Sequence, residues 1–462
     1  MDTRQSIIAL FLPVLLAACA TPHEPPAMQA LAPQQWHAPL PHGGSVTDLS
    51  QWWKQQGDPV LAQLVEAAQA ASPTIASARA RIEEARAAHV ATGAALLPSL
   101  DATSSVVRSS GQPPQPMATT AQAGFQSAWE IDLFGGGRAS RNAAQSRLEG
   151  ATAGWHDARV SVAAEAASLY FNQRACEKLL AIAMSDAASR SETARLAELS
   201  RQAGFMAPAV AALARASAAE ANARATQQRA QCEAGIKALA ALTALPETEL
   251  RQTLANPAEP APEAAMAIAS LPAEVLSQRP DLFAAERAVA AAAADTTAAR
   301  AQRLPRVALT GSIGRANIHA AGTDTDMTAW SVGPLSLSLP VFDAGRRAAN
   351  VDAAEARYEE AVAAYRARIR QAVREVEEAL VSLQSTAARG EDVRVAVQGY
   401  RASFDATEAR YKGGLASLVE LEEARRNRLA AENALVTLER ERRSAWVALY
   451  RAAGGGWRSE QR

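Results

Sequence analysis

Aromatic residues are scarce in this chain: Phe, Trp and Tyr make up 5% of its 462 residues, although 48% of the residues are hydrophobic. Alanine supplies much of that hydrophobic fraction, and such a composition suits long helices better than one thick core. The length also exceeds that of a usual single compact domain. We therefore expect several domains or an elongated fold.

The sequence also lacks recognisable catalytic and nucleotide-binding motifs. Its six histidines are scattered, and no two of them have metal-ligand spacing. No Walker loop, nucleophile elbow or acid–base pair is present, and Gly135-Gly136-Gly137 lacks the Lys-Ser/Thr ending of a phosphate loop. The net charge of −1 gives no field that favours nucleic acid. We expect a protein that is not an enzyme, needs no cofactor or metal and binds no nucleic acid.

Long hydrophobic runs are confined to the N-terminus. The run from Ile7 to Ala18 is too short for a mature membrane helix and predicts an export signal over residues 1–18. It ends at Leu16-Ala17-Ala18-Cys19, which resembles a bacterial lipobox, so we expect a covalent lipid on Cys19. The alternative is an ordinary signal peptide in which Cys19 occurs by chance. Ala20 follows, not the Asp that resembles an inner-membrane retention signal, which favours the outer membrane.

Two consequences follow for the rest of the chain. Residues 19–47, rich in Pro, Gln and Gly, predict a flexible tether between the lipid and the folded part. No later stretch approaches eighteen apolar residues, so a membrane crossing would require a closed β-barrel.

Prolines and glycines that begin or end secondary-structure elements recur at matched positions in the two halves of the chain. Matched positions lie 207 to 210 residues apart: Pro73 and Pro280, Pro98 and Pro305, Gly137 and Gly345, Gly204 and Gly414. This offset indicates two internal repeats, at 48–244 and 272–457, joined by an irregular Pro-rich linker at 245–271 and followed by a tail at 458–462. Each repeat predicts the order helix, strand, loop, strand, long helix, turn, helix.

Several short segments alternate between apolar and polar residues, as membrane strands with one lipid face and one wet face do. The apolar positions are Val106; Phe125, Trp129, Ile131 and Leu133; Val307, Leu309 and Ile313; and Leu335, Leu337, Leu339 and Val341. Glycine at the strand–helix junctions, Gly137 and Gly345, is expected to permit the bend.

Two long proline-free stretches, from Gly137 to Gly204 and from Gly345 to Gly413, carry heptad-like apolar patterns typical of coiled coils. At about 1.5 Å per residue, each helix would span roughly 100 Å. Such helices build a stalk or tube. The patterned positions are Leu148, Trp155, Val162, Leu169, Cys176 and Ala183, and Val362, Tyr365, Ile369, Ala372, Val376, Ala379 and Leu383.

Four strands per chain are too few to close a membrane barrel, because known barrels need roughly eight or more. Three chains would supply about twelve, and barrels above roughly eight strands enclose a channel. The expected fold is therefore mainly α with a transmembrane β part. Four strands per chain contribute to a trimeric 12-stranded β-barrel that continues into a helical tube.

Cys176 and Cys232 lie equally far from Gly204 along the chain. In a hairpin folded at Gly204 they reach the same height, and the periplasm is oxidising. This placement fits a disulfide; the alternative is two small thiols buried in the helix seam.

Several motifs, in consistent order over nearly the whole mature chain, resemble the NodT branch of the TolC superfamily. They are Trp129-Glu130-Ile131-Asp132-Leu133-Phe134-Gly135, Arg279-Pro280-Asp281-Leu282, Leu339-Pro340-Val341-Phe342, and Gly454-Gly455-Gly456-Trp457. Members of that branch are outer-membrane lipoproteins of resistance-nodulation-division (RND) efflux systems. The resemblance implies a TolC-like homotrimer in contact with outer-membrane lipid, with a periplasmic α-barrel. It also implies passive conduction of drugs and toxic compounds from an inner-membrane RND-type transporter and a periplasmic adaptor.

The same resemblance places a gate at the periplasmic tip, at Val419, Glu420, Glu423 and Arg426. Glu423 takes the position of an Asp that lines the closed aperture in the family, and Glu422 replaces an apolar residue. The alternative is that Glu420, Glu422 and Glu423 are solvated surface charges paired with arginines.

The turns at Gly204, Gly413 and Gly414 are expected to contact the adaptor, although turn chemistry alone also explains these glycines.

Two other functions stay open at this point. A type I protein-secretion outlet would share the tube, whereas a lipid-anchored coiled-coil structural protein would have no pore. The alternating strands in both repeats argue against the structural protein, and the lipobox and NodT-like motifs favour small-molecule efflux. The sequence does not identify the substrate.

Overall fold

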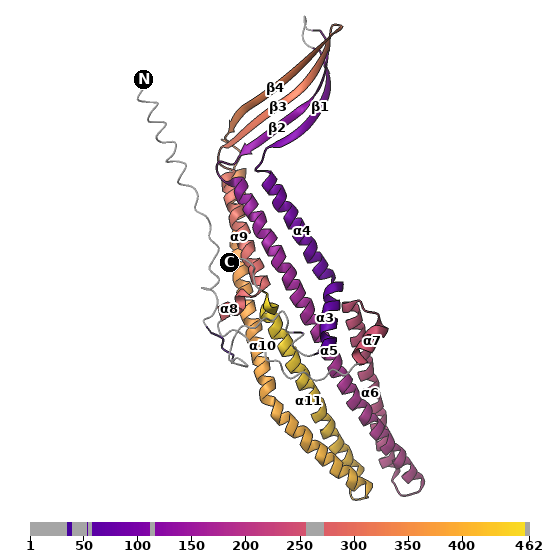
Figure 1. Ribbon diagram of the computed structural model, residues 1–462. Coiled ribbons are helices and arrows are strands. Elements are labelled where there is room, and N and C mark those ends of the chain that lie inside the picture. Colours follow the sequence, from indigo (N-terminus) through magenta and orange to yellow (C-terminus); the bar gives the residue numbers. More distant parts are fainter. Residues whose placement is uncertain (1–34, 39–52, 54–57, 111–115, 256–271, 458–462) are drawn as a thin grey trace. The chain divides into compact units, whose positions relative to one another are not determined.

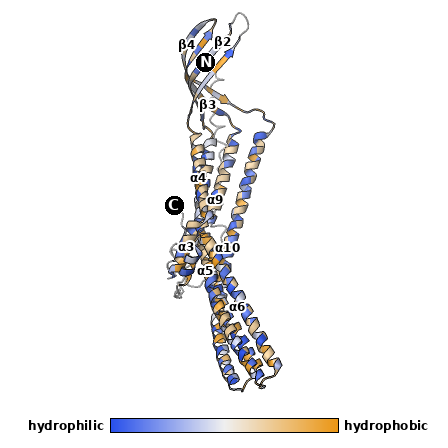
Figure 2. Ribbon diagram, turned by 90° about the vertical axis from the view of Figure 1, so that its right-hand side faces the viewer, coloured by the Kyte–Doolittle hydropathy of each residue, from blue (hydrophilic) through white to orange (hydrophobic). Residues whose placement is uncertain are grey.

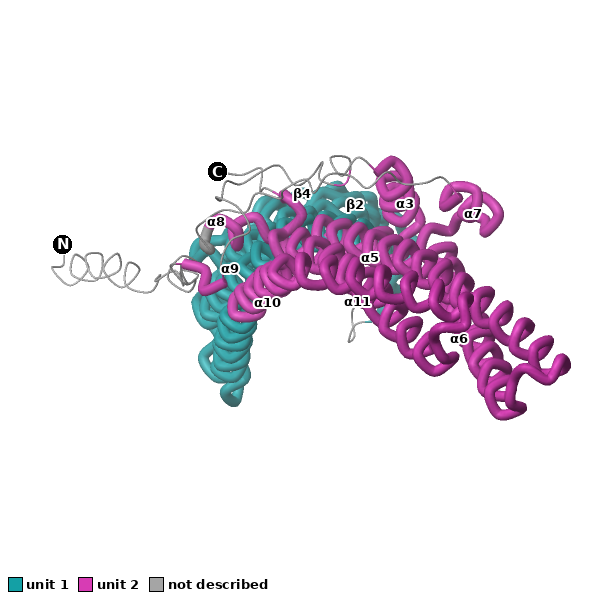
Figure 3. The backbone as a smooth tube through the Cα atoms, turned by 90° about the horizontal axis from the view of Figure 1, so that it is seen from below, with its two compact units in different colours: residues 1–27, 78–154, 282–368 teal, residues 28–77, 155–281, 369–462 magenta. Residues whose placement is uncertain are grey.

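The computed structural model describes residues 35–38, 53, 58–110, 116–255 and 272–457. The expected signal peptide, Cys19, most of the tether and the tail lie outside these residues. The chain divides into two compact units (Figure 3). The first contains Ala78–Gly154 and Leu282–Arg368, and the second contains Met28–Ser77, Trp155–Asp281 and Ile369–Arg462.

The first unit holds an antiparallel sheet with strand order β1-β2-β3-β4 (Figure 1). Its strands are β1 (Ser99–Ser109), β2 (Ala118–Ile131), β3 (Arg306–Ala320) and β4 (Thr323–Ser338). Each repeat therefore supplies two strands, as the sequence predicts, and the repeats meet where Phe125 of β2 pairs with Ile313 of β3. Hydrophilic and hydrophobic residues mix along the strands, as Figure 2 shows.

The second strand of each repeat ends earlier than the sequence predicts. The residues Leu133, Leu339 and Val341 were expected in strands and lie beyond the ends of β2 and β4. At the end of β2, the Asp132 carboxylate accepts hydrogen bonds from the backbone N–H groups of Gly137 and Arg138, at 3.1 and 2.9 Å. It thereby satisfies free donors at the start of the next helix, and the chain leaves the sheet.

The bend after β2 lies at Gly135, not at Gly137 as expected. Gly135 has φ +76°, a conformation that favours glycine, whereas Gly137 is already inside α5 (Gly136–Gln202). Position 137 needs glycine for space instead, because an added Cβ would lie 2.6 Å from Cδ2 of Leu96. Gly345, with φ +85°, directly precedes α10 (Arg346–Lys412), as expected.

Prolines open the helices that precede the strands. Helices α4 (Pro73–Ala94) and α9 (Pro280–Ala301) begin at the two matched prolines. The first helical residue needs no N–H bond, so proline is well suited there.

Two long helices follow the strands and turn back as hairpins. Helices α5 and α10 have 67 residues each. Helix α5 turns back into α6 (Pro208–Thr243), and α10 turns back into α11 (Leu418–Ala452). Within the described residues, no helix is both long and apolar enough to cross a membrane. The predicted seam of α10 is buried at Tyr365, Ile369, Ala372, Val376, Ala379 and Leu383.

The main core of the second unit joins α3 (Pro59–Ala71) to these hairpins. It also includes α7 (Glu247–Ala255), which lies inside the segment 245–271 that was expected to be irregular. That expectation was wrong because α7 fits between Pro246 and Pro257, and its Leu250 and Leu254 are buried in the core. The short helix α8 (Pro272–Ser277) opens the second repeat.

Part of the expected tether is packed against the core. Trp36 is buried, and the Glu377 carboxylate accepts hydrogen bonds from the backbone N–H groups of His37 and Ala38, at 2.6 and 2.7 Å. Residues 36–38 are therefore fixed to α10.

Candidate functional site

The two helix tips share one backbone design. Gly204 and Gly414 have φ values of +79° and +74°. The following residues, Phe205 and Leu415, donate their N–H groups back to the carbonyls of Ser200 and Arg410, both at 2.8 Å. A left-handed glycine followed by such a long-range bond is the Schellman helix end, so both turns require glycine.

Gly413, in contrast, is not among the residues with positive φ, and an added Cβ there would make only ordinary contacts of 3.5 Å. The turn therefore does not demand glycine at position 413.

Three large apolar side chains are exposed at these tips: Phe205 (88%), Leu415 (74%) and Val419 (63%). Phe205 and Leu415 are equivalent in the two repeats, because each follows the turn glycine. Exposed apolar side chains at such matched places are typical of a surface that a partner covers.

Behind the tips, small side chains of the first hairpin pack against larger apolar side chains of the second. The cluster contains Ala194 and Ala197 of α5, Ala214 and Ala218 of α6, Phe404 of α10, and Leu418 and Leu421 of α11. Apolar burial stabilises by about 25 cal/mol per Å². The four alanines bury less area each than Phe404, Leu418 and Leu421, which supply most of the apolar contact between the hairpins.

A cluster of buried charged side chains joins the same helices. Asp186 and Arg190 of α5 are 2% and 7% exposed, and Glu422 and Arg425 of α11 are 9% and 1% exposed. Arg190 donates to Asp186 at 3.0 Å and also to Glu422. Glu422 further accepts from Arg425 at 2.7 Å and from the Ser217 hydroxyl of α6 at 2.8 Å. One carboxylate thus connects three helices.

Arg425 is the most deeply placed of these groups. It donates to Ser189 Oγ and Thr193 Oγ1 of α5, at 3.0 and 3.3 Å, and its guanidinium lies 5.7 Å from the centre of the Phe404 ring. Burial lowers the pKa of Arg425 from its usual value, and the nearby Glu422 carboxylate opposes that shift. Arginine remains charged in proteins, so the two buried arginines and the two buried carboxylates balance. The partly exposed Arg224 of α6 also lies 3.5 Å from Asp186.

The residues predicted to gate the tip have different surroundings. Glu420 belongs to a capping box: its carboxylate accepts the Ser417 N–H at 2.6 Å, and its own N–H donates to Ser417 Oγ at 3.2 Å. The hydrogen bond that the Ser417 N–H donates to the carboxylate lowers the pKa of Glu420. Glu423 and Arg426 are exposed, and neither makes an ion pair with a described residue. The alternative that Glu422 is a solvated surface charge is wrong, because Glu422 is buried.

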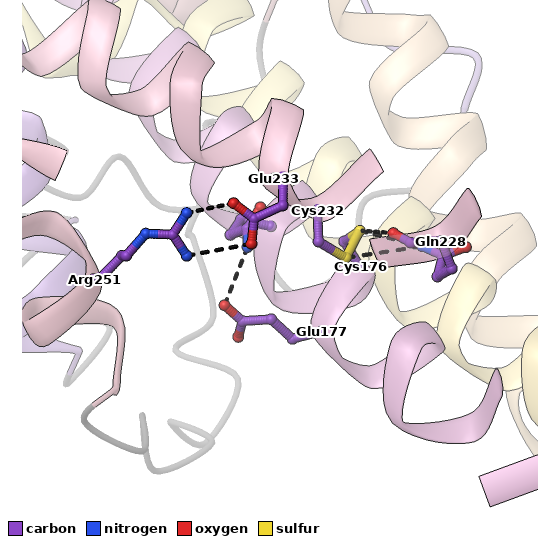
Figure 4. The surroundings of a disulfide bond; sticks show 7 residues. Cys176, Glu177, Gln228, Cys232, Glu233 and Arg251 are labelled. Atoms are coloured by element: carbon purple, nitrogen blue, oxygen red, sulfur yellow. Dashed lines mark hydrogen bonds and ion pairs between the residues drawn. A yellow bond between two sulfur atoms is a disulfide. The ribbon is translucent and has the colours of Figure 1, made fainter. Parts of the chain in front are cut away.

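Cys176 of α5 and Cys232 of α6 form a disulfide, with an S–S distance of 2.06 Å and a Cα–Cα distance of 5.6 Å (Figure 4). The Gln228 side-chain amide donates to Cys176 Sγ at 3.1 Å, and Arg251 of α7 pairs with Glu233 beside the bond. The first hairpin is therefore tied covalently.

Comparisons with known proteins agree with this architecture. The family described as outer membrane efflux protein matches residues 64–245 and 271–455, one match per repeat. The chain is 30% identical to the pyoverdine export outer membrane protein OpmQ of Pseudomonas putida, over 100% of this chain and 99% of that protein. It is 27% identical to nodulation protein T of Rhizobium leguminosarum bv. viciae, over 98% and 93%.

Solved structures of outer-membrane channels also match this chain. The outer-membrane channel OprN matches with a TM-score of 0.85 and 30% identity, over 95% of this chain and 99% of that one. The chain therefore belongs to the outer membrane efflux protein family, in its NodT-like branch, and is an outer-membrane efflux channel with a periplasmic helical part.

Proposed function

We propose that three copies of this chain form one pore, which an inner-membrane RND-type transporter feeds through a periplasmic adaptor. The observation that carries this proposal is the sheet. Within the part of the chain that the structure describes, its outer strands β1 and β4 each pair with one neighbour, so both keep an unpaired edge. An unpaired backbone group in lipid costs several kcal/mol. Pairing β1 of one copy with β4 of the next removes every edge and gives about twelve strands.

The pore conducts passively. We assign it no catalysis and no cofactor besides the lipid on Cys19, and we place its energy source in the inner-membrane partner. Relatives are named for the export of pyoverdine, solvents and toluene, and we propose small toxic compounds as the substrates here. A strain without this chain should become sensitive to such compounds and regain resistance on complementation. Lost secretion of a protein, with unchanged sensitivity, would favour the type I secretion alternative instead.

The buried ion cluster, we propose, holds the tip closed by joining α11 to the first hairpin. The apolar contacts around it are not directional, whereas the hydrogen bonds of Glu422 and Arg425 fix how α11 lies against α5 and α6. Glu423 would lie on the exposed side of α11, where three copies can gather carboxylates around the axis.

The conductance of single channels tests the role of Glu423. Glu423→Ala replaces three long side chains at the aperture by methyl groups, so the aperture should widen and the single-channel conductance should rise by about twofold or more. Loss of the three carboxylates should also lower cation selectivity. Planar-bilayer recordings of purified protein measure both. If conductance and selectivity stayed unchanged, Glu423 would be an ordinary surface charge and not a gate residue.

The exposed apolar residues at the tips are proposed to bind the adaptor. Phe205→Asp combined with Leu415→Asp should reduce crosslinking to the adaptor in cells by about tenfold, because charged groups would enter an apolar contact. Phe205→Leu with Leu415→Met is the matched control and should crosslink normally. Both proteins should conduct normally in bilayers. Full crosslinking of the Asp variant would exclude these side chains from the contact.

A further inference from the structure

The pairing of the strands assigns each side chain of the sheet to one of two faces, because directly paired residues point the same way. Rows of paired residues on one face are apolar at the end of the sheet nearer the helices. One such row is Ile131–Val307–Leu337, and another is Ala102–Phe125–Ile313–Trp330. On the opposite face the corresponding rows are polar, as in Asp101–Gln126–Ser312–Ser331. The apolar face is the one that suits lipid.

The apolar face changes character immediately beyond Phe125. The next row toward the β3–β4 turn is Ser104–Ala123–Arg315–Thr328, and Trp330 is exposed in the row before it. Tryptophan is enriched where a membrane meets water. Arg315 is therefore the first charged residue outside the apolar band.

Arg315 is exposed and makes no ion pair with any residue that the structure describes. The two nearest carboxylates on this face lie farther toward the turn and have other partners. Asp326 accepts from the Asn317 amide at 3.1 Å, and Asp324 contacts the His319 ring at 2.9 Å. From the apolar band toward the β3–β4 turn, the unpaired Arg315 therefore comes before Asp326 and Asp324.

A depression of about 430 Å³ lies next to Arg315 on the sheet. The small side chains of Ser104, Ala121 and Ala123 form part of its lining, together with Val106, Asn317 and Asp326. Ser105 and Gln122 complete its lining, and it extends from Arg315 toward the β3–β4 turn. The apolar row of Phe125, Ile313 and Trp330 lies on the other side of Arg315. The depression therefore has room for a polar headgroup, and the apolar row offers a surface for an acyl chain.

We propose that Arg315 binds the phosphate of a phosphorylated lipid in the outer leaflet, whose acyl chain lies over the apolar row of Phe125 and Ile313. This inference rests on the proposed function, which places the apolar face against lipid and the β3–β4 turn outside the cell. Guanidinium and phosphate form paired, charge-assisted hydrogen bonds. The carboxylates beyond Arg315 keep the anionic group at the row of Arg315. The contact thereby fixes the depth of the sheet in the membrane.

Lipid retention by the purified, full-length protein tests the proposal. Native mass spectrometry should find bis-phosphorylated lipid A bound to the wild type, and Arg315→Gln should bind it roughly tenfold more weakly. Arg306→Gln is the matched control, since Arg306 is an exposed strand arginine on the opposite face. This control should retain the lipid as the wild type does.

Three outcomes would overturn the site: equal retention by Arg315→Gln, equal retention of lipid A stripped of its phosphates, and complete displacement by inorganic phosphate, which would indicate a site for the free anion. Arg315→Gln should still conduct in planar bilayers, which shows that it folds. Failure of the wild type itself to conduct would count against the pore and not against the lipid site, because retention is measured separately.

Discussion

Glu422→Gln is expected to open the periplasmic tip and to raise the conductance of single channels several-fold. Glutamine keeps the shape of the side chain but leaves Arg190 and Arg425 buried with only Asp186 as a buried countercharge. Removing one partner of a buried ion pair typically costs about 3–5 kcal/mol. The apolar contacts of Leu418 and Leu421 do not neutralise the buried guanidinium groups, so α11 should separate from α5 and α6 and let water reach them.

A second ion pair between the same helices provides the matched control. Lys178 of α5 and Glu439 of α11 are 2.6 Å apart, but their side chains are 59% and 50% exposed. Exposed pairs contribute about 0–1 kcal/mol, so Glu439→Gln should conduct as the wild type does. If both variants raised the conductance equally, burial of the charge would not be the cause.

Neutralising the whole cluster should reverse the effect of the single change. The variant Asp186→Asn, Arg190→Met, Glu422→Leu, Arg425→Met leaves no uncompensated buried charge, and apolar replacement of a complete buried ion set is often neutral or stabilising. Its conductance should return toward the wild-type value. A fourfold variant that is as open as Glu422→Gln would mean that the charges act in some way other than by attachment.

Removal of the disulfide by Cys176→Ala with Cys232→Ala is expected to destabilise the first hairpin. The disulfide joins residues that are 56 positions apart in the sequence. For a closed loop of that length, the lost entropy of the unfolded chain stabilises the folded state by about 4 kcal/mol. Thermal unfolding followed by circular dichroism should show a lower midpoint than in the wild type. The midpoint of the wild type should fall similarly under reducing conditions, whereas that of the variant should not change.

The wild type should contain no free thiol when it is denatured without reductant, because Cys19 carries the lipid in this account. Two free thiols per chain would show that Cys176 and Cys232 are not bonded in the protein as purified.

Features set by local sequence could be predicted. Prolines at 73 and 280 begin helices, and Gly204 and Gly414 adopt the left-handed turn, because proline and glycine act through their own backbone. The buried positions of α10 could be predicted from the three- and four-residue spacing of its apolar residues. The helix α7 was missed because the burial of Leu250 depends on the folded surroundings. The bend was placed at Gly137 because three consecutive glycines offer similar backbone freedom, and only the cap that Asp132 makes with residues 137 and 138 shows where the helix begins.

The buried cluster at the tip could be predicted only in part. Glu422 stands where the family pattern has an apolar residue, which signals an unusual surrounding. Its partner Arg190 lies 232 residues away in sequence, and no local spacing links the two. Sequence reasoning therefore favoured Glu423, whose role as a gate residue stays a prediction, as does that of Arg426.

The central claim is that several four-stranded sheets complete one pore wall. The native mass of the conducting species, purified in detergent and then reconstituted into planar bilayers, tests this claim most directly. We expect a particle of three chains that conducts ions and loses conductance when it is dissociated. A single folded chain that conducts by itself, or a three-chain particle without conductance, would contradict it.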